Sequence, residues 1–468
     1  MADSTTKVRM NCFDETWLGI NTPVERIQFH IILYADGEID PARLNKALVS
    51  GIKRHPALRT TLRRGLLYQI RELREDLGHD IVHFRDLTDP QEIAARGQKD
   101  EEAYYDQAIR DWVNIPFNLA KDLPFRVMVL KRRPADYSLV FSFHHYVSDA
   151  LQAFRFMLEV FKEYNGEDLG ADPMPEDTIE CHKPNEILEL MRSPRMKIRH
   201  FYPKILSSLF HRFVIGLFQP PTRIYHDRSD RLTGEAAFLH RTIPAAELNE
   251  LEARVRTLSV TVNDLLLAAL YKTIEKWNHL HGKKSRKISI MVPVDLGRKS
   301  SRHIVSNQLS YVSPKTWPED RADPQKLLKK VSLDTARVIR NGNAFSQVYF
   351  TYTLTVLTST MVKIVGTIFI KTRVYVDTTL MTNVGRIRLR DSLKDGLPRL
   401  GEARLVDISG LTPVTSPWGL SMVSGIYDAH LNMVLTYWPA MFSEKKANEF
   451  FDLFMNEVRQ YPLGAPSI

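Results

Sequence analysis

The junction at residues 141–154, FSFHHYVSDALQAF, constrains the fold more than any other stretch of the chain. The alternation before it predicts a strand with one face made of Leu139, Phe141, Phe143 and His145, and the other of Val140, Ser142 and His144. Three- and four-residue steps after it predict an amphipathic helix whose buried stripe is Leu151, Phe154, Leu158 and Phe161. A strand that passes directly into a helix indicates an α/β protein.

Three polar side chains lie at this junction, namely His144, His145 and Asp149. Asp149 is expected near the first turn of the helix, where a carboxylate accepts backbone N–H bonds. A neutral imidazole at the end of a sheet has the pKa range of a general base. The other interpretation is structural: a helix cap beside a satisfied polar residue. No GxSxG, P-loop or HExxH sequence occurs, which argues against serine hydrolysis, phosphoryl transfer and zinc proteolysis.

Strand and helix patterns alternate along the whole chain of 468 residues, a length that favours two domains. Strands are predicted at 26–36 and on both sides of the turn at 134–136, with a helix at 41–55 between them. After a linker, a strand from 236, a helix, a second helix entered at Thr261 and a strand at 287–297 follow. A last strand and an amphipathic helix capped by Ser443 complete the pattern. We expect an N-terminal lobe at 1–185, a basic amphipathic crossover at 186–235 and a C-terminal lobe at 236–468.

The composition is that of a globular protein, with 44% hydrophobic and 25% charged residues and a net charge of +9. Two distant cysteines and an N-terminus without an apolar signal predict a cytoplasmic protein without a disulfide framework. Between Arg192 and His226 there is no acidic residue, and this basic segment suits either peripheral contact with an anionic membrane or burial between domains. The apolar run at 353–370 contains Lys363, so we expect one or two buried helices and no membrane span. No nucleic-acid-binding motif accompanies the basic charge.

The segment HHYVSDA resembles the HHxxxDG motif of condensation domains, wax ester synthases and related acyltransferases. Further pieces that resemble motifs of these families occur in the expected order: RHPALRT (54–60), IPFNLAKDLPFRVMVL (115–130), VNDLLLAAL (262–270), VPVDLGRKS (292–300) and MTNVGRI (381–387). The resemblance extends from about residue 10 to residue 460. It implies an α/β fold of two chloramphenicol-acetyltransferase-like lobes, each a mixed sheet with flanking helices, arranged in a V around a central channel.

The resemblance also implies roles for individual residues. His145 would be the general base, and His144 would help to hold its loop. Asp149 would shape the loop through a salt bridge to Arg298. Ala150 stands where the family has a glycine whose backbone N–H approaches the acyl group. Asn383 would lie at the cleft between the lobes and contact substrate.

The function implied is an O- or N-acyltransferase that moves an acyl group from a thioester to an alcohol or amine. The donor would be acyl-CoA or an acyl group on the phosphopantetheine arm of a carrier protein, with no tightly bound cofactor, no metal and no nucleic acid. The apolar run and the basic segment favour a fatty acyl group and peripheral membrane contact through 192–226. We expect a stand-alone monomer. A condensation enzyme with carrier-bound substrates on both sides, and a catalytically silent recruitment module, are the alternatives.

Overall fold

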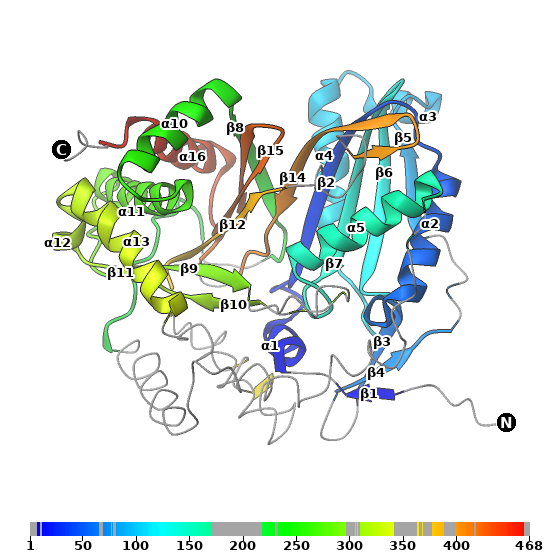
Figure 1. The fold of residues 1–468 in the computed structure, drawn as a ribbon, viewed down its shortest axis with the longest axis horizontal. Helices are drawn as coiled ribbons and strands as arrows, with labels where there is room; N and C mark the ends of the chain where they lie inside the picture. Colours follow the sequence, from blue (N-terminus) through cyan, green and yellow to red (C-terminus); the bar gives the residue numbers. More distant parts are fainter. Residues whose placement is uncertain are drawn as a thin grey trace.

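A computed structural model describes residues 7–9, 12–64, 69–75, 77, 81–167, 169, 218–229, 233–295, 305, 307, 309–340, 363–364, 367, 377–387, 398–415 and 418–462. Two layered lobes lie side by side, each a twisted sheet with helices packed against it (Figure 1). This arrangement of mixed sheets and flanking helices is the predicted α/β class with two lobes.

The N-terminal lobe is built on a six-stranded sheet in the order β13-β14-β2-β7-β6-β5. Its strands are β2 (Gln28–Asp36), β5 (Val82–Asp86), β6 (Phe125–Arg133), β7 (Asp136–His144), β13 (Arg399–Leu400) and β14 (Ala403–Leu411). All neighbours are antiparallel except β5 and β6. A smaller sheet is formed by β1 (Lys7–Arg9), β4 (Gln69–Leu73) and β3 (Thr60–Arg64).

The two faces of the six-stranded sheet carry different helices. Helices α2 (Pro41–Arg54) and α5 (Ala150–Asn165) pack against Phe29, Leu139 and Phe141, whereas α4 (Glu101–Val113) packs against Ile32 and Val140 on the opposite face. This is the alternation predicted for residues 139–144. The predicted stripe of α5 is confirmed at Phe154 and Phe161, which are buried. Leu151 and Leu158 are only partly buried, although Leu158 packs against the N-terminal core. The remaining N-terminal helices are α1 (Cys12–Ile20), η1 (Pro56–Arg59) and α3 (Pro90–Arg96).

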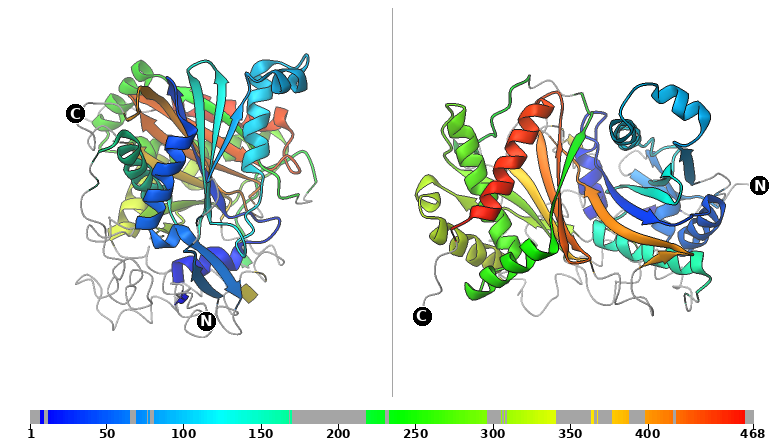
Figure 2. Two further views of the ribbon diagram at one scale, coloured as in Figure 1. Left: turned by 90° about the vertical axis from the view of Figure 1, so that its right-hand side faces the viewer. Right: turned by 90° about the horizontal axis from the view of Figure 1, so that it is seen from above.

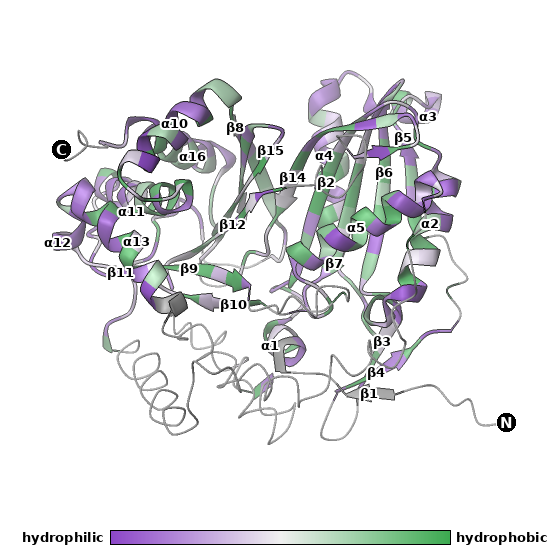
Figure 3. Ribbon diagram, in the orientation of Figure 1, coloured by the Kyte–Doolittle hydropathy of each residue, from purple (hydrophilic) through white to green (hydrophobic). Residues whose placement is uncertain are grey.

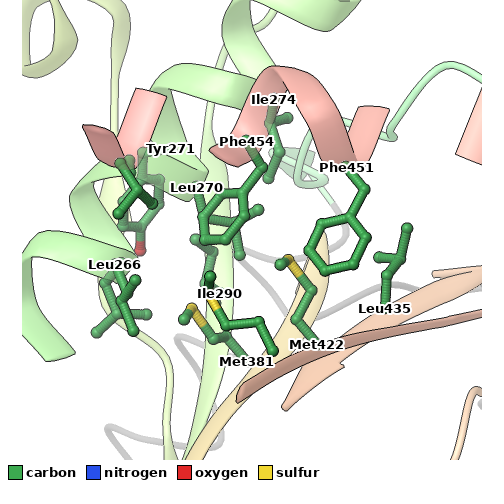
Figure 4. Packing of buried hydrophobic residues seen from close by; sticks show 14 of the residues in the cluster. Leu266, Leu270, Tyr271, Ile274, Ile290, Met381, Met422, Leu435, Phe451 and Phe454 are labelled. Carbon is green, nitrogen blue, oxygen red and sulfur yellow. The ribbon is translucent and has the colours of Figure 1, made fainter. Parts of the chain in front are cut away.

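The C-terminal lobe has a seven-stranded sheet in the order β10-β9-β12-β15-β16-β8, with β11 paired to β9. Its strands are β8 (Ala237–Ile243), β9 (Ile288–Asp295), β10 (Leu309–Val312), β11 (Lys315–Thr316), β12 (Thr379–Arg386), β15 (Leu420–Tyr427) and β16 (His430–Tyr437). Helices described in this lobe include α10 (Ala245–Thr257), α11 (Val262–Leu280), α12 (Pro318–Arg321), α13 (Pro324–Arg340) and α16 (Glu444–Gln460). Figure 4 shows Leu266 and Leu270 of α11 and Phe451 and Phe454 of α16 in one cluster with Met381 and Met422 of the sheet.

Local sequence signals account for the helix starts. The Thr261 hydroxyl accepts the backbone N–H of Asp264, whose carboxylate accepts the backbone N–H of Thr261 in return. Ser443 caps α16 through Lys446 N, as predicted. Hydrophobic residues concentrate in the central strands, while the outlying helices α3 and α12 are mostly hydrophilic (Figure 3).

Strand β14 joins the two lobes. It follows β12 in the C-terminal half of the chain, yet it pairs with β2 of the N-terminal lobe from Leu411↔His30 to Arg404↔Asp36. The view from above in Figure 2 shows this strand, drawn in orange, curving across to the other lobe. The C-terminal half of the chain therefore supplies strands β13 and β14 to the sheet of the N-terminal lobe, and the sheets do not follow the order of the chain.

Two predicted segments lie largely outside the described residues. Of the basic segment 192–226 the structure describes only 218–226, and of the apolar run 353–370 only Lys363, Ile364 and Thr367. Ile364 is helical but 46% exposed, so the expected burial does not hold at that position. Within the described part of the chain, no helix has the length and apolar character needed to cross a membrane.

Candidate functional site

The predicted histidine loop connects β7 to α5 and is held at both ends. His144 is the last residue of β7 and pairs with Gln28 of β2, and the next backbone N–H, that of His145, donates to Ile27 O at 2.9 Å. Asp149 caps α5, with its Oδ1 accepting the backbone N–H of Gln152 at 3.0 Å. The cap predicted for Asp149 is therefore present, and the loop is fixed between two rigid elements.

The His145 imidazole is enclosed by aromatic rings. It stacks on Trp17 of α1 with ring centroids 4.1 Å apart and planes 10° apart, and Phe29 lies at 5.0 Å on a tilted plane. Only 7% of His145 is exposed. This burial lowers the pKa of His145 to about 4, although the backbone carbonyls of His145 and Ser148 act in the opposite direction. His145 is therefore neutral at cellular pH and has a lone pair available to accept a proton.

His144 is arranged differently. Its Nδ1 accepts the backbone N–H of Tyr146 at 3.3 Å, which leaves the ring proton on Nε2, and its ring meets Phe117 edge-on. Burial, with a smaller contribution from His145, lowers the pKa of His144 to about 3. A ring that hydrogen-bonds the backbone of its own loop has the geometry that the predicted loop-holding role needs.

A buried ion pair fastens helix α1 to this loop. Arg71 Nη2 of β4 lies 2.6 Å from Asp14 Oδ2 of α1, with 1% and 0% of the two side chains exposed. The same nitrogen donates to the carbonyl of Tyr146 at 3.3 Å, and the guanidinium lies over the Tyr146 ring. Sequence reasoning missed Asp14, Trp17 and Arg71, because no local motif indicates that helix 12–20 and strand 69–73 meet at the histidine.

Two residues beyond β9 contact the N-terminal lobe, one of them at the histidine loop. Asn307 Nδ2 donates to the carbonyl of His145 at 2.5 Å, and Val305 N donates to His55 Nδ1 at 3.4 Å. His55, in the RHPALRT segment, also pairs through Nε2 with Glu159 of α5 at 2.8 Å. The second half of the chain thus supplies part of the support for the histidine. Asn307 follows the VPVDLGRKS motif by only seven residues, which was the one available signal for its place.

The other predicted residues are distributed over the two lobes. Ala150 is the first residue of α5 and is half-buried against the N-terminal core. Asn383 lies in β12, where its Oδ1 accepts the N–H of Gly385 at 2.7 Å next to an irregularity in the pairing with β15. Arg298 falls outside the described residues, so its salt bridge to Asp149 stays a prediction, as does substrate contact by Asn383.

The site shows no arrangement suited to a metal ion. Among the described residues, no group of three or more His, Cys, Asp and Glu side chains is placed to hold one. The chemistry that the described side chains can supply is proton transfer by an imidazole in an enclosed, mostly apolar setting.

Comparison with known families decides the assignment. The family model "Condensation domain" matches residues 27–292, which is more than half of the chain and includes the histidine loop. The chain belongs to the condensation-domain family. Condensation domains are enzymes that transfer acyl groups and form amide or ester bonds.

Relatives and solved structures agree with this family. The chain is 28% identical to surfactin synthase subunit 1 of Bacillus subtilis (strain 168) over 157 residues, 34% of this chain but only 4% of that relative. The first condensation domain of the calcium-dependent antibiotic synthetase, solved with substrate analogue 2a, superposes with a TM-score of 0.72 at 11% identity over 99% of this chain and 98% of that one. A doubly substituted starter condensation domain of rhizomide synthetase, in complex with C8-CoA and Leu-SNAC, gives 0.68 at 14% identity over 99% and 96%. At such identities these structures establish the fold.

Proposed function

We propose that this chain is an acyltransferase that moves an acyl group from a thioester to a hydroxyl or amine, with His145 as the general base. The observation that carries the proposal is the state of His145: a buried, neutral imidazole on a loop fixed by β2, α5, Arg71 and Asn307. A base held in one orientation in a water-poor site is what deprotonation of an attacking nucleophile needs.

The His145 imidazole alone can account for both proton transfers in this reaction. As the acceptor O–H or N–H attacks the thioester carbonyl carbon, the imidazole takes its proton and a C–O or C–N bond forms. The C–S bond then breaks, and the departing thiolate recovers the proton from the imidazolium. The backbone N–H of Ala150, at the start of α5, is our candidate donor to the oxyanion formed between these steps.

The donor is an acyl-CoA or an acyl group on a carrier protein. Support for CoA comes from the fold, since the rhizomide domain was solved with C8-CoA. The same complex also contains Leu-SNAC, and one curated relative of this chain is nonribosomal peptide synthetase kk1B of Curvularia clavata. These relatives favour, as a second candidate, an amide-forming enzyme whose two substrates are both carried on proteins. We retain a fatty acyl group as the first substrate to test.

The test is a panel of acyl-CoAs from short to long chain, offered with mixed alcohol and amine acceptors, with thiol release and acylated products followed by mass spectrometry. Replacing the base, His145→Ala, should lower the transfer rate by roughly 10²- to 10⁴-fold. The matched control is His279→Ala, which changes an exposed histidine at the end of α11 and should leave the rate unchanged.

The outcomes separate the candidates. Product from the wild type that is lost in His145→Ala supports a CoA-dependent acyltransferase. Product that forms only when the donor is loaded on a holo carrier protein supports the second candidate. Equal product from the wild type and His145→Ala contradicts the role of His145, and no transfer from either kind of donor would leave a silent recruitment module as the better description.

A further inference from the structure

One face of the His145 imidazole is covered by the indole of Trp17. The near-parallel stack, with planes 10° apart at 4.1 Å, leaves no space for a water molecule between the rings. Phe29 lies against His145 on a tilted plane. Trp17 itself is half-buried. With 7% of its surface exposed, His145 can be approached only over a small part of the ring.

The guanidinium of Arg71 holds both sides of this stack in place. Arg71 pairs with Asp14, which lies three residues before Trp17 and therefore on the same side of helix α1. Arg71 also binds the carbonyl of Tyr146, the residue after His145. Arg71 thus contacts both the helix that carries Trp17 and the residue that follows His145. That common anchor fixes the position of the indole relative to the imidazole.

We propose that Trp17 is a positioning residue that makes His145 selective for the acceptor over water. This inference rests on the proposed function and adds a determinant of specificity to it. If water occupies the acceptor position, the imidazole takes its proton, the water oxygen bonds to the thioester carbon and the C–S bond breaks. The thiolate recovers the proton, and the products are a free acid and a thiol. A covered base offers its lone pair only to a nucleophile that the rest of the site has positioned.

The first experiment measures how the thioester is divided between transfer and hydrolysis. Trp17→Leu keeps the position apolar but uncovers the imidazole. The ratio of hydrolysis to transfer should rise by up to about 10²-fold, the loss that a small misplacement of reacting groups can cause. Trp17→Phe restores a flat ring and should stay near the wild-type ratio. Trp317→Leu, the same change at a residue 37% exposed at the start of α12, is the matched control. If both rates fall together at a constant ratio, Trp17 is only structural and the proposal is wrong.

A second experiment needs no substrate. Diethylpyrocarbonate carbethoxylates accessible neutral imidazoles, and peptide mass spectrometry gives the rate at His145 relative to the exposed His279 of the same chain. We expect Trp17→Leu to raise the His145 rate several-fold, and Trp17→Phe and Trp317→Leu to leave it unchanged. An equal rate in the wild type and Trp17→Leu would overturn the proposal.

The two experiments separate this inference from the function on which it rests. A wild type that neither transfers nor hydrolyses any thioester counts against the proposed function, while the carbethoxylation rates still decide whether Trp17 covers the base. Circular dichroism and thermal melting confirm that each variant is folded. Should Trp17→Leu fail to fold, Trp17→Met takes its place with the same expected direction in both measurements.

Discussion

At the scale of single residues, three buried histidines of the N-terminal lobe are kept uncharged. Burial lowers the pKa of His30 and His144 to about 3 and that of His145 to about 4. His30 belongs to a short buried hydrogen-bond chain. Trp112 Nε1 donates to Ser142 Oγ at 2.9 Å, and the Ser142 hydroxyl forms a hydrogen bond with His30 Nδ1 at 2.8 Å.

These depressed pKa values predict acid sensitivity. Between about pH 6.5, where an unfolded histidine titrates, and the folded pKa of His30 at about 3, the unfolded state binds a proton that the folded state does not. The free energy of unfolding must then fall as pH falls through this window. Between pH 6 and pH 5 the wild type should lose about 1 kcal/mol more than His30→Gln. Urea titrations at pH 5, 6 and 7 measure this, with His279→Gln as control; parallel curves for the wild type and His30→Gln would contradict it.

At the scale of elements, helix α1 depends on a charge pair for its place. It lies at the lower edge of the sheets in Figure 1, next to the residues that follow β7. Asp14 and Arg71 are both fully buried, and Arg71 serves the helix and the histidine loop together. A buried charge that loses its partner remains desolvated without compensation. The ion pair between Asp14 and Arg71 therefore contributes both to the stability of the fold and to the position of the histidine loop.

We expect Arg71→Met to lower the free energy of unfolding by about 3–5 kcal/mol, because the buried carboxyl group of Asp14 would lose its ion-pair partner. The double variant Asp14→Asn, Arg71→Met removes both charges and should lose clearly less than the single variant. Urea denaturation of the two variants gives the comparison. Equal losses in both would mean that the charge pair is not what anchors the helix. Arg63→Met, which changes an exposed arginine of β3, is the matched control.

At the scale of the whole molecule, the lobes are joined by more than the chain. Strand β14 belongs to the N-terminal sheet although it comes from the C-terminal half of the chain. In addition, one apolar cluster contains Ile32 and Trp112 of the N-terminal lobe together with Val423 and Val434 of the C-terminal lobe. Asn114, at the end of α4, adds a polar contact: it accepts from Ala236 N and donates to Ala236 O, both at 2.8 Å. The relative position of the lobes is thus set at several independent places.

Asn114→Ala should remove both hydrogen bonds and lower the free energy of unfolding by about 1–3 kcal/mol. Because β8 begins at the next residue, Ala237, we also expect faster hydrogen exchange at the start of that strand. Asn118→Ala, at an exposed position four residues later, is the control. A loss of stability without any change in exchange at β8 would show that Asn114 stabilises only its own lobe.

Much of this architecture could be predicted from local sequence. The strand ending at Asp36, the helix entered at Pro41, the hairpin around Ala135 and the caps Asp149, Thr261 and Ser443 follow from patterns within a few residues, because periodicity and capping are local properties. HHYVSDA likewise indicated the candidate base from sequence. The face of α5 was predicted only in part, since the sheet and α2 decide which residues of that helix are buried.

The surroundings of the candidate base were decided by tertiary structure alone. Trp17, Arg71 and Asn307 come from segments far apart in the chain, and they meet His145 only because α1, β4 and the residues beyond β9 converge there. The same holds for β14, whose partner β2 lies near the other end of the chain. A local sequence pattern predicts which side chains lie on each face of a helix or strand. Whether those side chains are buried, stacked or ion-paired depends on the other elements that pack against that face. The sequence by itself thus determined the elements and the candidate base, and the packing of the two lobes decided what encloses it.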